Sequence, residues 1–196
     1  MTTESFTKIS KLFDNELEIS DEEAKKSIAR AIKPDKNLVS LPLLKTSPKR
    51  VLLITPPGTT EESFGRLSGA TGELPMLGLA YIAAALRDQG NIVKIIDYEV
   101  NRRPFDKVQA DIESFAPDLV GMTVYITNMK RCSAVAEIVK KVNPKTTVVL
   151  GGPQVSIFPE EGLVSPNVDL IVISEGEIII RNVINALGDE EALKKV

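Results

Sequence analysis

Residues 50–57 read RVLLITPP, a short apolar run that is closed by two prolines. A run of this length, rich in branched apolar residues and bounded by a turn signal, is typical of a strand buried on both faces of a parallel sheet. Four similar runs follow along the chain, in the stretches NIVKIIDY, DLVGMTVY, KTTVVLGGP and VDLIVISEGE. We therefore expect five buried strands in this part of the chain.

Helical patterns follow the strands. The longer ones are GLAYIAAALRDQG, PFDKVQADIESFAP, NMKRCSAVAEIVKKVNP and EIIIRNVINALGD, and a short helical turn is expected at PEEGL. Strands that alternate with helices indicate an α/β fold, with a doubly wound parallel sheet covered on both faces. Five strands favour the flavodoxin-like order 2-1-3-4-5 over the six-stranded order of dinucleotide-binding domains.

The first part of the chain differs in composition from this alternation. The stretch SDEEAKKSIARAI has a capping residue at its start and acids in its first turn, and it predicts a helix that includes Ala31 and Ile32. A stretch with three prolines, KPDKNLVSLPLLKTSPKR, follows it and predicts a linker. We expect a helical N-terminal extension and linker over residues 1–48, and one Rossmann-like domain over residues 49–190.

The composition excludes several classes of function. The chain has 196 residues, a net charge of −3 and no basic stripe with interleaved aromatic residues, which argues against a nucleic-acid surface. It has neither an apolar stretch long enough to span a membrane nor the apolar core of a signal peptide, so we expect a cytoplasmic protein. With one cysteine and no histidine, the chain alone cannot assemble a zinc site or an iron–sulfur cluster.

The position of a ligand site follows from the fold class. In an open parallel sheet, ligands bind outside the carboxyl ends of the strands. The stretches that follow the strands, among them the long loop PPGTTEESFGRLSGATGELP, are rich in Gly, Ser and Thr and contain few acids or bases. Cys132 lacks a histidine that could activate it, so we interpret it as a core residue. We predict no catalytic residue and no metal ligand.

Two nucleotide-binding alternatives stay open on the residues alone. Asp97, at the end of the second strand, could bond a ribose hydroxyl, although no GxGxxG motif follows the first strand. The loop start TPPGTTEES is distantly similar to the phosphate loop of flavodoxins, which would place FMN at this edge. Tyr98 and Tyr125 are then the nearest rings that could stack on the flavin.

Several short motifs occur in a characteristic order. After Pro56–Pro57 come PMLGLAYIAAAL, PDLVG, GGPQVSIFPEE and SEGE. Over residues 50–187 the chain resembles the N-terminal cobalamin-binding domain of the cobalamin-dependent radical S-adenosylmethionine proteins. The resemblance implies a flavodoxin-like fold that holds cobalamin above the strand ends, with the nucleotide tail of the cofactor inserted into the sheet.

The resemblance also implies a set of site residues. Thr123 takes the hydroxyl position of a G-x-S-x-L-like motif, Tyr125 takes its leucine position, and Gly151–Gly152 matches a glycine pair beside the tail. Purely structural roles stay open for some of them, namely close helix packing for Gly78, a turn for the glycine pair and an ordinary core position for Tyr125. The implied cofactor-binding residues are Pro57, Gly58, Leu77, Gly78, Thr123, Val124, Tyr125, Thr127, Gly151, Gly152, Pro153, Glu175 and Gly176.

The chain departs from the family pattern at several points. Gln154 and Ser174 stand where histidine and glycine are common, and the absence of histidine implies base-off binding without a histidine lower ligand. The C-x-x-x-C-x-x-C motif is also missing, so S-adenosylmethionine and the 4Fe-4S cluster would belong to a radical S-adenosylmethionine domain in cis or in trans. We expect an excised module of a methyltransferase or cyclase that is not catalytic alone. The alternatives are a flavodoxin-like interaction module without cofactor and an FMN-binding module.

Overall fold

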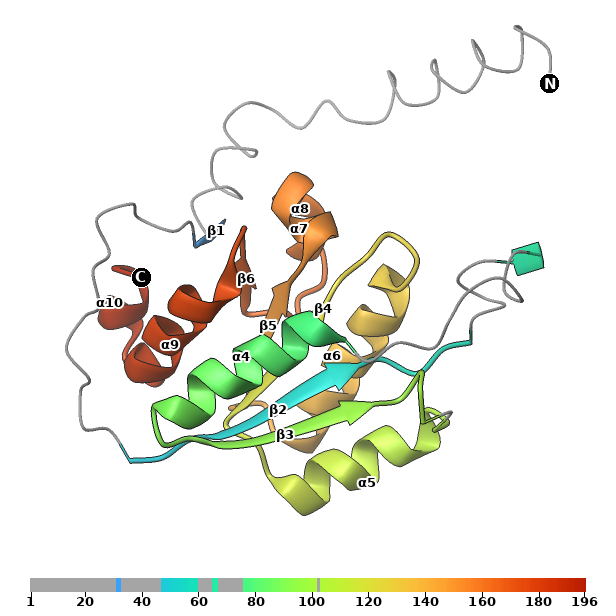
Figure 1. Ribbon diagram of the computed structural model, residues 1–196, viewed down its shortest axis with the longest axis horizontal. Helices are drawn as coiled ribbons and strands as arrows, with labels where there is room; N and C mark the ends of the chain where they lie inside the picture. The colour runs from blue at the N-terminus through green and yellow to red at the C-terminus, as the bar shows by residue number, and fades with distance from the viewer. Residues whose placement is uncertain (1–30, 33–46, 60–64, 67–75, 102) are drawn as a thin grey trace, which may run out of the picture.

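The computed structural model describes residues 31–32, 47–59, 65–66, 76–101 and 103–196 (Figure 1). The rest of the predicted N-terminal extension and most of the long loop after the first predicted strand lie outside these residues. The elements are β1 (Ala31–Ile32), β2 (Arg50–Thr55), α4 (Leu77–Asp88), β3 (Ile92–Asp97), α5 (Asp106–Phe115), β4 (Leu119–Thr123), α6 (Met129–Val142), β5 (Thr147–Gly151), α7 (Pro153–Ile157), α8 (Pro159–Gly162), β6 (Leu170–Val172), α9 (Gly176–Ala186) and α10 (Glu190–Leu193).

The strands form one parallel sheet in the order β1-β6-β5-β4-β2-β3. Without β1, the strands that the apolar runs predict stand in the order 2-1-3-4-5, which confirms the flavodoxin-like topology. Since β2 and β4 lie at the centre with neighbours on both sides, their side chains are buried on both faces. This is why both strands read as continuous apolar runs in the sequence.

The additional strand β1 corrects the prediction for the end of the N-terminal helix. Ala31 and Ile32 pair in parallel with Ile171 and Val172 of β6, so these two residues are extended and not helical. The helical spacing around them is a local signal, and pairing with the open edge of β6 overrides it because that edge offers unpaired backbone N–H and C=O groups.

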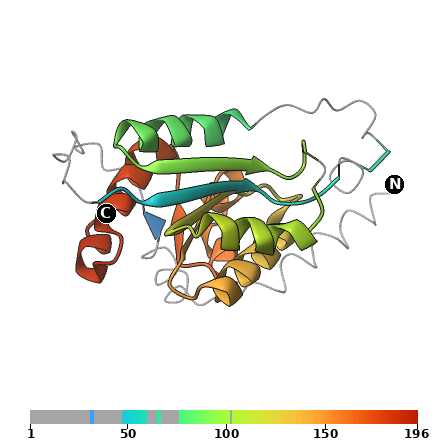
Figure 2. The ribbon, with the colours of Figure 1, turned by 90° about the horizontal axis from the view of Figure 1, so that it is seen from below.

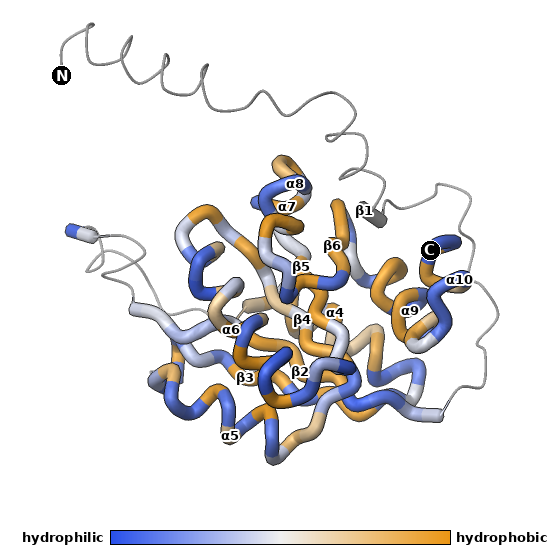
Figure 3. The backbone as a smooth tube through the Cα atoms, turned by 180° about the vertical axis from the view of Figure 1, so that it is seen from behind, coloured by the Kyte–Doolittle hydropathy of each residue, from blue (hydrophilic) through white to orange (hydrophobic). Residues whose placement is uncertain are grey.

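Two layers of helices cover the sheet. Figure 2 shows α4 on one side of β2 and β3, with α5 and α6 on the other. Successive side chains of β2 point to opposite faces of the sheet. Leu52 and Ile54 therefore pack in the core under α5 and α6, whereas Val51 and Leu53 pack in the core under α4 and α9. The hydropathy colouring in Figure 3 shows the strands as the apolar centre of the domain. None of the helices over the described residues is long and apolar enough to cross a membrane.

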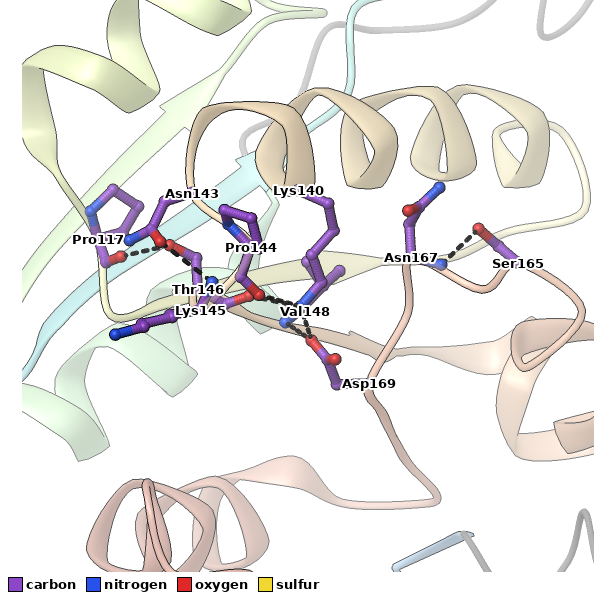
Figure 4. Close-up of polar contacts among 10 residues, drawn as sticks. All are labelled: Pro117, Lys140, Asn143, Pro144, Lys145, Thr146, Val148, Ser165, Asn167 and Asp169. Atoms are coloured by element: carbon purple, nitrogen blue, oxygen red, sulfur yellow. Dashed lines mark hydrogen bonds and ion pairs between the residues drawn. The ribbon is translucent and has the colours of Figure 1, made fainter.

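Polar contacts fasten the amino ends of the strands (Figure 4). The Lys140 ammonium donates to the carboxylate of Asp169 at 2.7 Å and to the carbonyl of Thr146 at 2.8 Å. Asp169 also accepts from the backbone N–H of Val148 at 2.6 Å, and the buried Thr146 hydroxyl donates to the carbonyl of Pro117 at 2.9 Å. These bonds join α6 to the starts of β5 and β6, at the edge opposite the predicted site.

Candidate functional site

The ends of β4 and β5 continue to pair beyond the last strand residues. Thr123 stands opposite Gly151 in the register of the two strands. The N–H of Val124 donates to the carbonyl of Gly151 at 2.7 Å, and the N–H of Gln154 donates back to the carbonyl of Val124 at 3.2 Å. Backbone bonds therefore hold together the two stretches in which the sequence places most of the site.

Gly152 is required by this backbone contact. Its φ is +103°, and a Cβ at this position would lie 2.9 Å from the N and 3.0 Å from the O of Val124. Both features exclude a side chain, because the conformation is costly for other residues and the backbone of Val124 cannot move aside. The turn role that the sequence left open is correct for Gly152.

Gly151 is different, because packing does not require a glycine there. A Cβ would meet only ordinary contacts, 3.8 Å from the carbonyl oxygen and 3.9 Å from the Cβ of Val172. Its φ is outside the left-handed region. No packing contact among the described residues therefore explains why residue 151 is a glycine.

The loop after β4 is fixed by Asn128, which the sequence analysis missed. The buried Asn128 side chain accepts from the N–H of Tyr125 at 2.8 Å and donates to the carbonyl of Thr123 at 3.1 Å. It thus holds both ends of the segment between Thr123 and α6. Asparagine before a helix is an ordinary capping signal in sequence, and only the structure shows that this side chain bonds the loop instead.

Large apolar side chains are exposed around these loops. Tyr125 is 39% exposed and Ile126 is 78% exposed, so the interpretation of Tyr125 as an ordinary core residue is wrong. Further exposed apolar side chains belong to α4, to α7 and the residue that follows it, and to α9, which all begin at the same edge. One of them is Leu77, which the sequence predicts as a site residue. The members of this apolar rim are Leu77, Tyr81, Tyr125, Ile126, Ile157, Phe158 and Ile178.

The starts of α4 and α9 carry two predicted glycines with different surroundings. Gly78 is exposed, and a Cβ there would meet no described heavy atom within 4 Å, so the close-packing role for Gly78 is wrong. A Cβ on Gly176 would lie 3.0 Å from Cδ1 of Ile82, so Gly176 serves the close approach of α9 to α4. Leu77 and Gly78 are therefore exposed at the start of α4, at the carboxyl edge.

The segment after β2 is partly buried. Pro57 is buried, and a Cβ on Gly58 would lie 2.5 Å from the guanidinium carbon of Arg131. Arg131 pairs with Glu99 at 3.7 Å, so this contact joins the ends of β2, β3 and the start of α6. Gly58 lies against Arg131 as part of this packing.

The last residue of β2, Thr55, is a polar residue that the sequence analysis did not single out. It is 4% exposed, and its Oγ1 has no hydrogen-bond partner among the described residues. In the sequence it stands inside an apolar run, where a threonine reads as an ordinary strand residue. The structure instead places an unpaired buried hydroxyl at the edge where ligands bind in this fold.

The remaining predicted residues divide between the surface and the interior. Val124 is fully buried, whereas Thr127, Pro153 and Glu175 are exposed at the carboxyl edge. Ser174 adopts a left-handed φ of +69°, which accounts for a preference for glycine at this position.

Three polar side chains near the carboxyl edge bond to other groups of the fold. Gln154 is buried and its amide donates to the carboxylate of Glu161, so it does not project over the strand ends. Tyr98 is fully buried and its hydroxyl donates to Asp111 at 2.7 Å, which removes one of the two rings proposed to stack on a flavin. Asp97, the proposed ribose ligand, accepts from the N–H groups of Glu99 and Val100 and closes the turn after β3.

Cys132 is a core residue, as predicted. It is fully buried in the core under α5 and α6, and this burial raises the pKa of its thiol to about 12. Burial and a raised pKa both disfavour the thiolate, which is the form that acts as nucleophile or metal ligand, so Cys132 is a structural residue. Among the residues that the structure describes, no group of three or more Cys, Asp or Glu side chains is arranged to hold a metal ion.

Comparison with known proteins identifies relatives of this arrangement. The sequence profile of the B12 binding domain matches residues 67–184. The chain is 37% identical over 148 residues to an uncharacterized methyltransferase of Pyrococcus horikoshii, which covers 75% of this chain and 31% of that protein. It is 31% identical over 118 residues to the anaerobic magnesium-protoporphyrin IX monomethyl ester cyclase of Rubrivivax gelatinosus. That match covers 59% of this chain and 21% of the cyclase.

A further relative is the cobalamin-dependent radical SAM methyltransferase TokK of Streptomyces tokunonensis, 35% identical over 69 residues, or 35% of this chain and 10% of that protein. The fold also matches the structure of the radical S-adenosylmethionine methyltransferase TsrM from Kitasatospora setae with cobalamin and a [4Fe-4S] cluster bound. That match has a TM-score of 0.56 at 20% identity and covers 73% of this chain and 25% of the other. The chain spans less than a third of the length of each of these relatives.

Proposed function

This chain belongs to the B12-binding domain family, and from that membership we propose that its carboxyl edge binds cobalamin for a longer radical S-adenosylmethionine enzyme of the methyltransferase or cyclase type. The observation that carries the proposal is the apolar rim near the ends of β4 and β5, which backbone hydrogen bonds hold together. Large apolar side chains that are exposed on several segments at one end of a sheet offer a surface for a ligand or a partner.

The residues at this edge fit the cofactor in two respects. A corrin ring presents a broad and largely apolar face, and the rim residues Tyr125 and Ile126 offer a matching surface. Thr123 supplies a hydroxyl, and Gly151 leaves backbone uncovered, beside the place where the nucleotide tail would enter. When bound, cobalamin supplies a cobalt centre that carries a methyl group. The chain's residues bind the cofactor, orient it and exclude water from one of its faces.

We further propose that the cofactor is bound base-off and without a protein imidazole below cobalt. The support is the absence of histidine from the chain. Tyr125, or a residue of the segment after Pro57, would then lie beneath the ring. The nature of the lower ligand is the protein's main means of tuning a cofactor metal. An electron paramagnetic resonance spectrum of the cob(II)alamin complex should lack nitrogen superhyperfine splitting, and its presence would contradict base-off binding.

The other parts of the enzyme would come from outside this chain. S-adenosylmethionine and a 4Fe-4S cluster need a radical S-adenosylmethionine domain, in cis or in trans, because a single cysteine cannot ligate such a cluster. TokK and TsrM are both radical S-adenosylmethionine methyltransferases, which supports this arrangement. We therefore expect the isolated chain to bind the corrinoid and to show no methyl transfer when S-adenosylmethionine is added.

Titration with hydroxocobalamin, followed by its visible spectrum, tests the binding proposal. Wild-type protein should shift the spectrum saturably. Ile126→Ala removes an exposed rim side chain and should weaken binding about fivefold, the equivalent of about 1 kcal/mol of lost apolar burial. Ile92→Ala is the matched control, because Ile92 is an exposed isoleucine at the amino end of β3, and it should leave the affinity unchanged.

The same titration separates the alternatives. If hydroxocobalamin leaves no spectral change and FMN is bound, the domain is a flavin module. If neither ligand is bound, the domain is an interaction module that has lost its cofactor. Burial of Tyr98 disfavours the flavin alternative, because only Tyr125 of the two candidate rings remains accessible.

A further inference from the structure

The hydroxyl of Thr55 is buried but forms no hydrogen bond within the described part of the fold. The exposed fraction of Thr55 is 4%, and its Oγ1 has no hydrogen-bond partner among the described residues. An unpaired buried hydroxyl costs free energy comparable to a lost hydrogen bond, whereas valine has the same shape and avoids that cost. The hydroxyl therefore points to a partner outside the fold itself.

The direction of the Thr55 side chain follows from the alternation along β2. Val51 and Leu53 pack in the core under α4 and α9, and Thr55 continues the same face. Val51 stands opposite Leu119 in the register of β2 and β4, and Leu119 belongs to the same core. Thr123, four residues after Leu119, faces the same side as Thr55.

The row extends to β5, where Gly151 stands opposite Thr123. On one face of the sheet, β2 and β4 thus end in the hydroxyls of Thr55 and Thr123, and β5 ends in the backbone of Gly151 without a side chain. Of the three, only Thr55 is fully enclosed, since Thr123 and Gly151 are partly exposed. A ligand that contacts Thr123 and Gly151 at the ends of β4 and β5 lies on the same face of the sheet as the Thr55 hydroxyl.

We propose that the Thr55 hydroxyl donates a hydrogen bond to the nucleotide tail of the bound corrinoid, as a second tail-binding hydroxyl beside Thr123. This inference rests on the proposed function, because it requires a corrinoid at the carboxyl edge. The tail carries phosphate and ribose oxygens that accept hydrogen bonds, and a threonine hydroxyl can donate to either. Thr55 is then a residue that distinguishes corrinoids with a tail from those without one.

The experiment compares two ligands and two properties of the protein. Hydroxocobalamin has the nucleotide tail and aquacobinamide lacks it, so the difference between their affinities isolates tail contacts. Thr55→Val should weaken hydroxocobalamin binding about tenfold and leave aquacobinamide binding unchanged, while Thr55→Ser, which keeps the hydroxyl, should retain the wild-type affinity for both. Without ligand, Thr55→Val should unfold at the same urea concentration as wild type or at a higher one.

Thr146→Val is the matched control. Thr146 is as buried as Thr55, but its hydroxyl donates to the carbonyl of Pro117 at the opposite edge. It should lower the midpoint of urea unfolding without changing the affinity for either corrinoid. Thr55→Val should thus weaken binding without a loss of stability, and Thr146→Val should lower stability without a loss of binding.

Several outcomes would overturn the inference. Unchanged hydroxocobalamin affinity in Thr55→Val excludes the tail contact, and an equal loss for both corrinoids shows a disturbed edge in its place. A clear loss of stability in ligand-free Thr55→Val shows that the hydroxyl has a partner in the fold. If wild-type protein binds neither corrinoid, the proposed function itself fails and the inference falls with it.

Discussion

Neighbouring glycines at the end of β5 are constrained by different contacts. Gly152→Ala should lower the free energy of unfolding by about 2 kcal/mol or more, because a side chain meets the backbone of Val124 in a left-handed conformation. Gly151→Ala should stay within about 1 kcal/mol of wild type, since a methyl group there meets only ordinary contacts. Urea denaturation followed by circular dichroism measures both values.

The same two variants separate folding from binding. Gly151→Ala should fold normally and bind hydroxocobalamin more weakly than wild type, because its methyl group covers backbone beside Thr123. Equal affinities of Gly151→Ala and wild type would show that the tail does not approach this residue. Gly152→Ala serves as the comparison, because its loss of binding should be accompanied by a loss of stability.

Because the thiol of Cys132 is buried, the free energy of unfolding should depend on pH in the alkaline range. Burial raises its pKa to about 12 from the ordinary value of 9.0. The unfolded chain therefore loses this proton first as pH rises, and the free energy of unfolding should be constant below pH 9 and fall between pH 9 and 12 from this group. Burial likewise raises the pKa of Tyr98, which acts in the same direction in wild type and variant.

Comparing wild type with Cys132→Ala at pH 8 and pH 10.5 isolates the thiol. The fall in the free energy of unfolding between the two values should be smaller in the variant, by about 1–2 kcal/mol. Identical pH profiles would mean that the thiol is not buried in the protonated form. A thiol reagent such as Ellman's reagent should react with wild type at pH 8 only after unfolding.

At the scale of elements, the loop between β4 and α6 depends on one side chain. Asn128→Ala removes an acceptor for the N–H of Tyr125 and a donor to the carbonyl of Thr123. It should lower the free energy of unfolding by about 1–2 kcal/mol, since two partly buried backbone groups lose their partner. It should also weaken hydroxocobalamin binding, because Tyr125 and Ile126 are no longer held in place. Thr127→Ala, an exposed neighbour, should leave stability unchanged.

Most elements could be predicted because their causes are local. A buried parallel strand must be apolar throughout, so β2 to β6 and their order follow from the runs and from the helices between them. The strand β1 could not be predicted, because two residues carry no periodicity and their partner is the distant edge of β6. The short helix α7 after Gly152 was not expected either, since no apolar spacing marks it.

The candidate site could be predicted only in part for a similar reason. The motifs indicate the ends of β4 and β5, and the structure brings Thr123, Val124, Gly151 and Gly152 together there. Thr55 stayed hidden because its hydroxyl is conspicuous only once its surroundings are known to be apolar and without partners. Asn128 stayed hidden because its partners are backbone groups, which no sequence displays.

At the scale of the whole molecule, the two edges of the sheet have separate tasks. Hydrogen bonds between Lys140, Asp169 and Thr146 stabilise the amino edge, whereas the carboxyl edge carries the apolar rim and the candidate site. Lys140→Met should lower the free energy of unfolding by about 1–2 kcal/mol, because the carbonyl of Thr146 and the carboxylate of Asp169 lose a charged donor. The part due to the ion pair is reduced by solvent screening, since Asp169 is partly exposed.

Hydroxocobalamin binding should not change in Lys140→Met, and a change in affinity would show that the two edges are coupled. Lys141→Met is the control one residue along. Lys141 forms only an exposed pair with Glu137, so its replacement should alter stability by less than about 0.5 kcal/mol. Chemical denaturation and the spectral titration together distinguish the edges.

The way in which the loop after β4 is held has a consequence for how such a domain can evolve. Backbone bonds and Asn128 fix its position, and none of the side chains at Tyr125, Ile126 and Thr127 makes a hydrogen bond to another described residue. Substitutions at these three positions therefore alter what the surface presents without moving it. A lineage could adapt the loop to a new bound partner one residue at a time, and a library randomised there would retain a largely folded population.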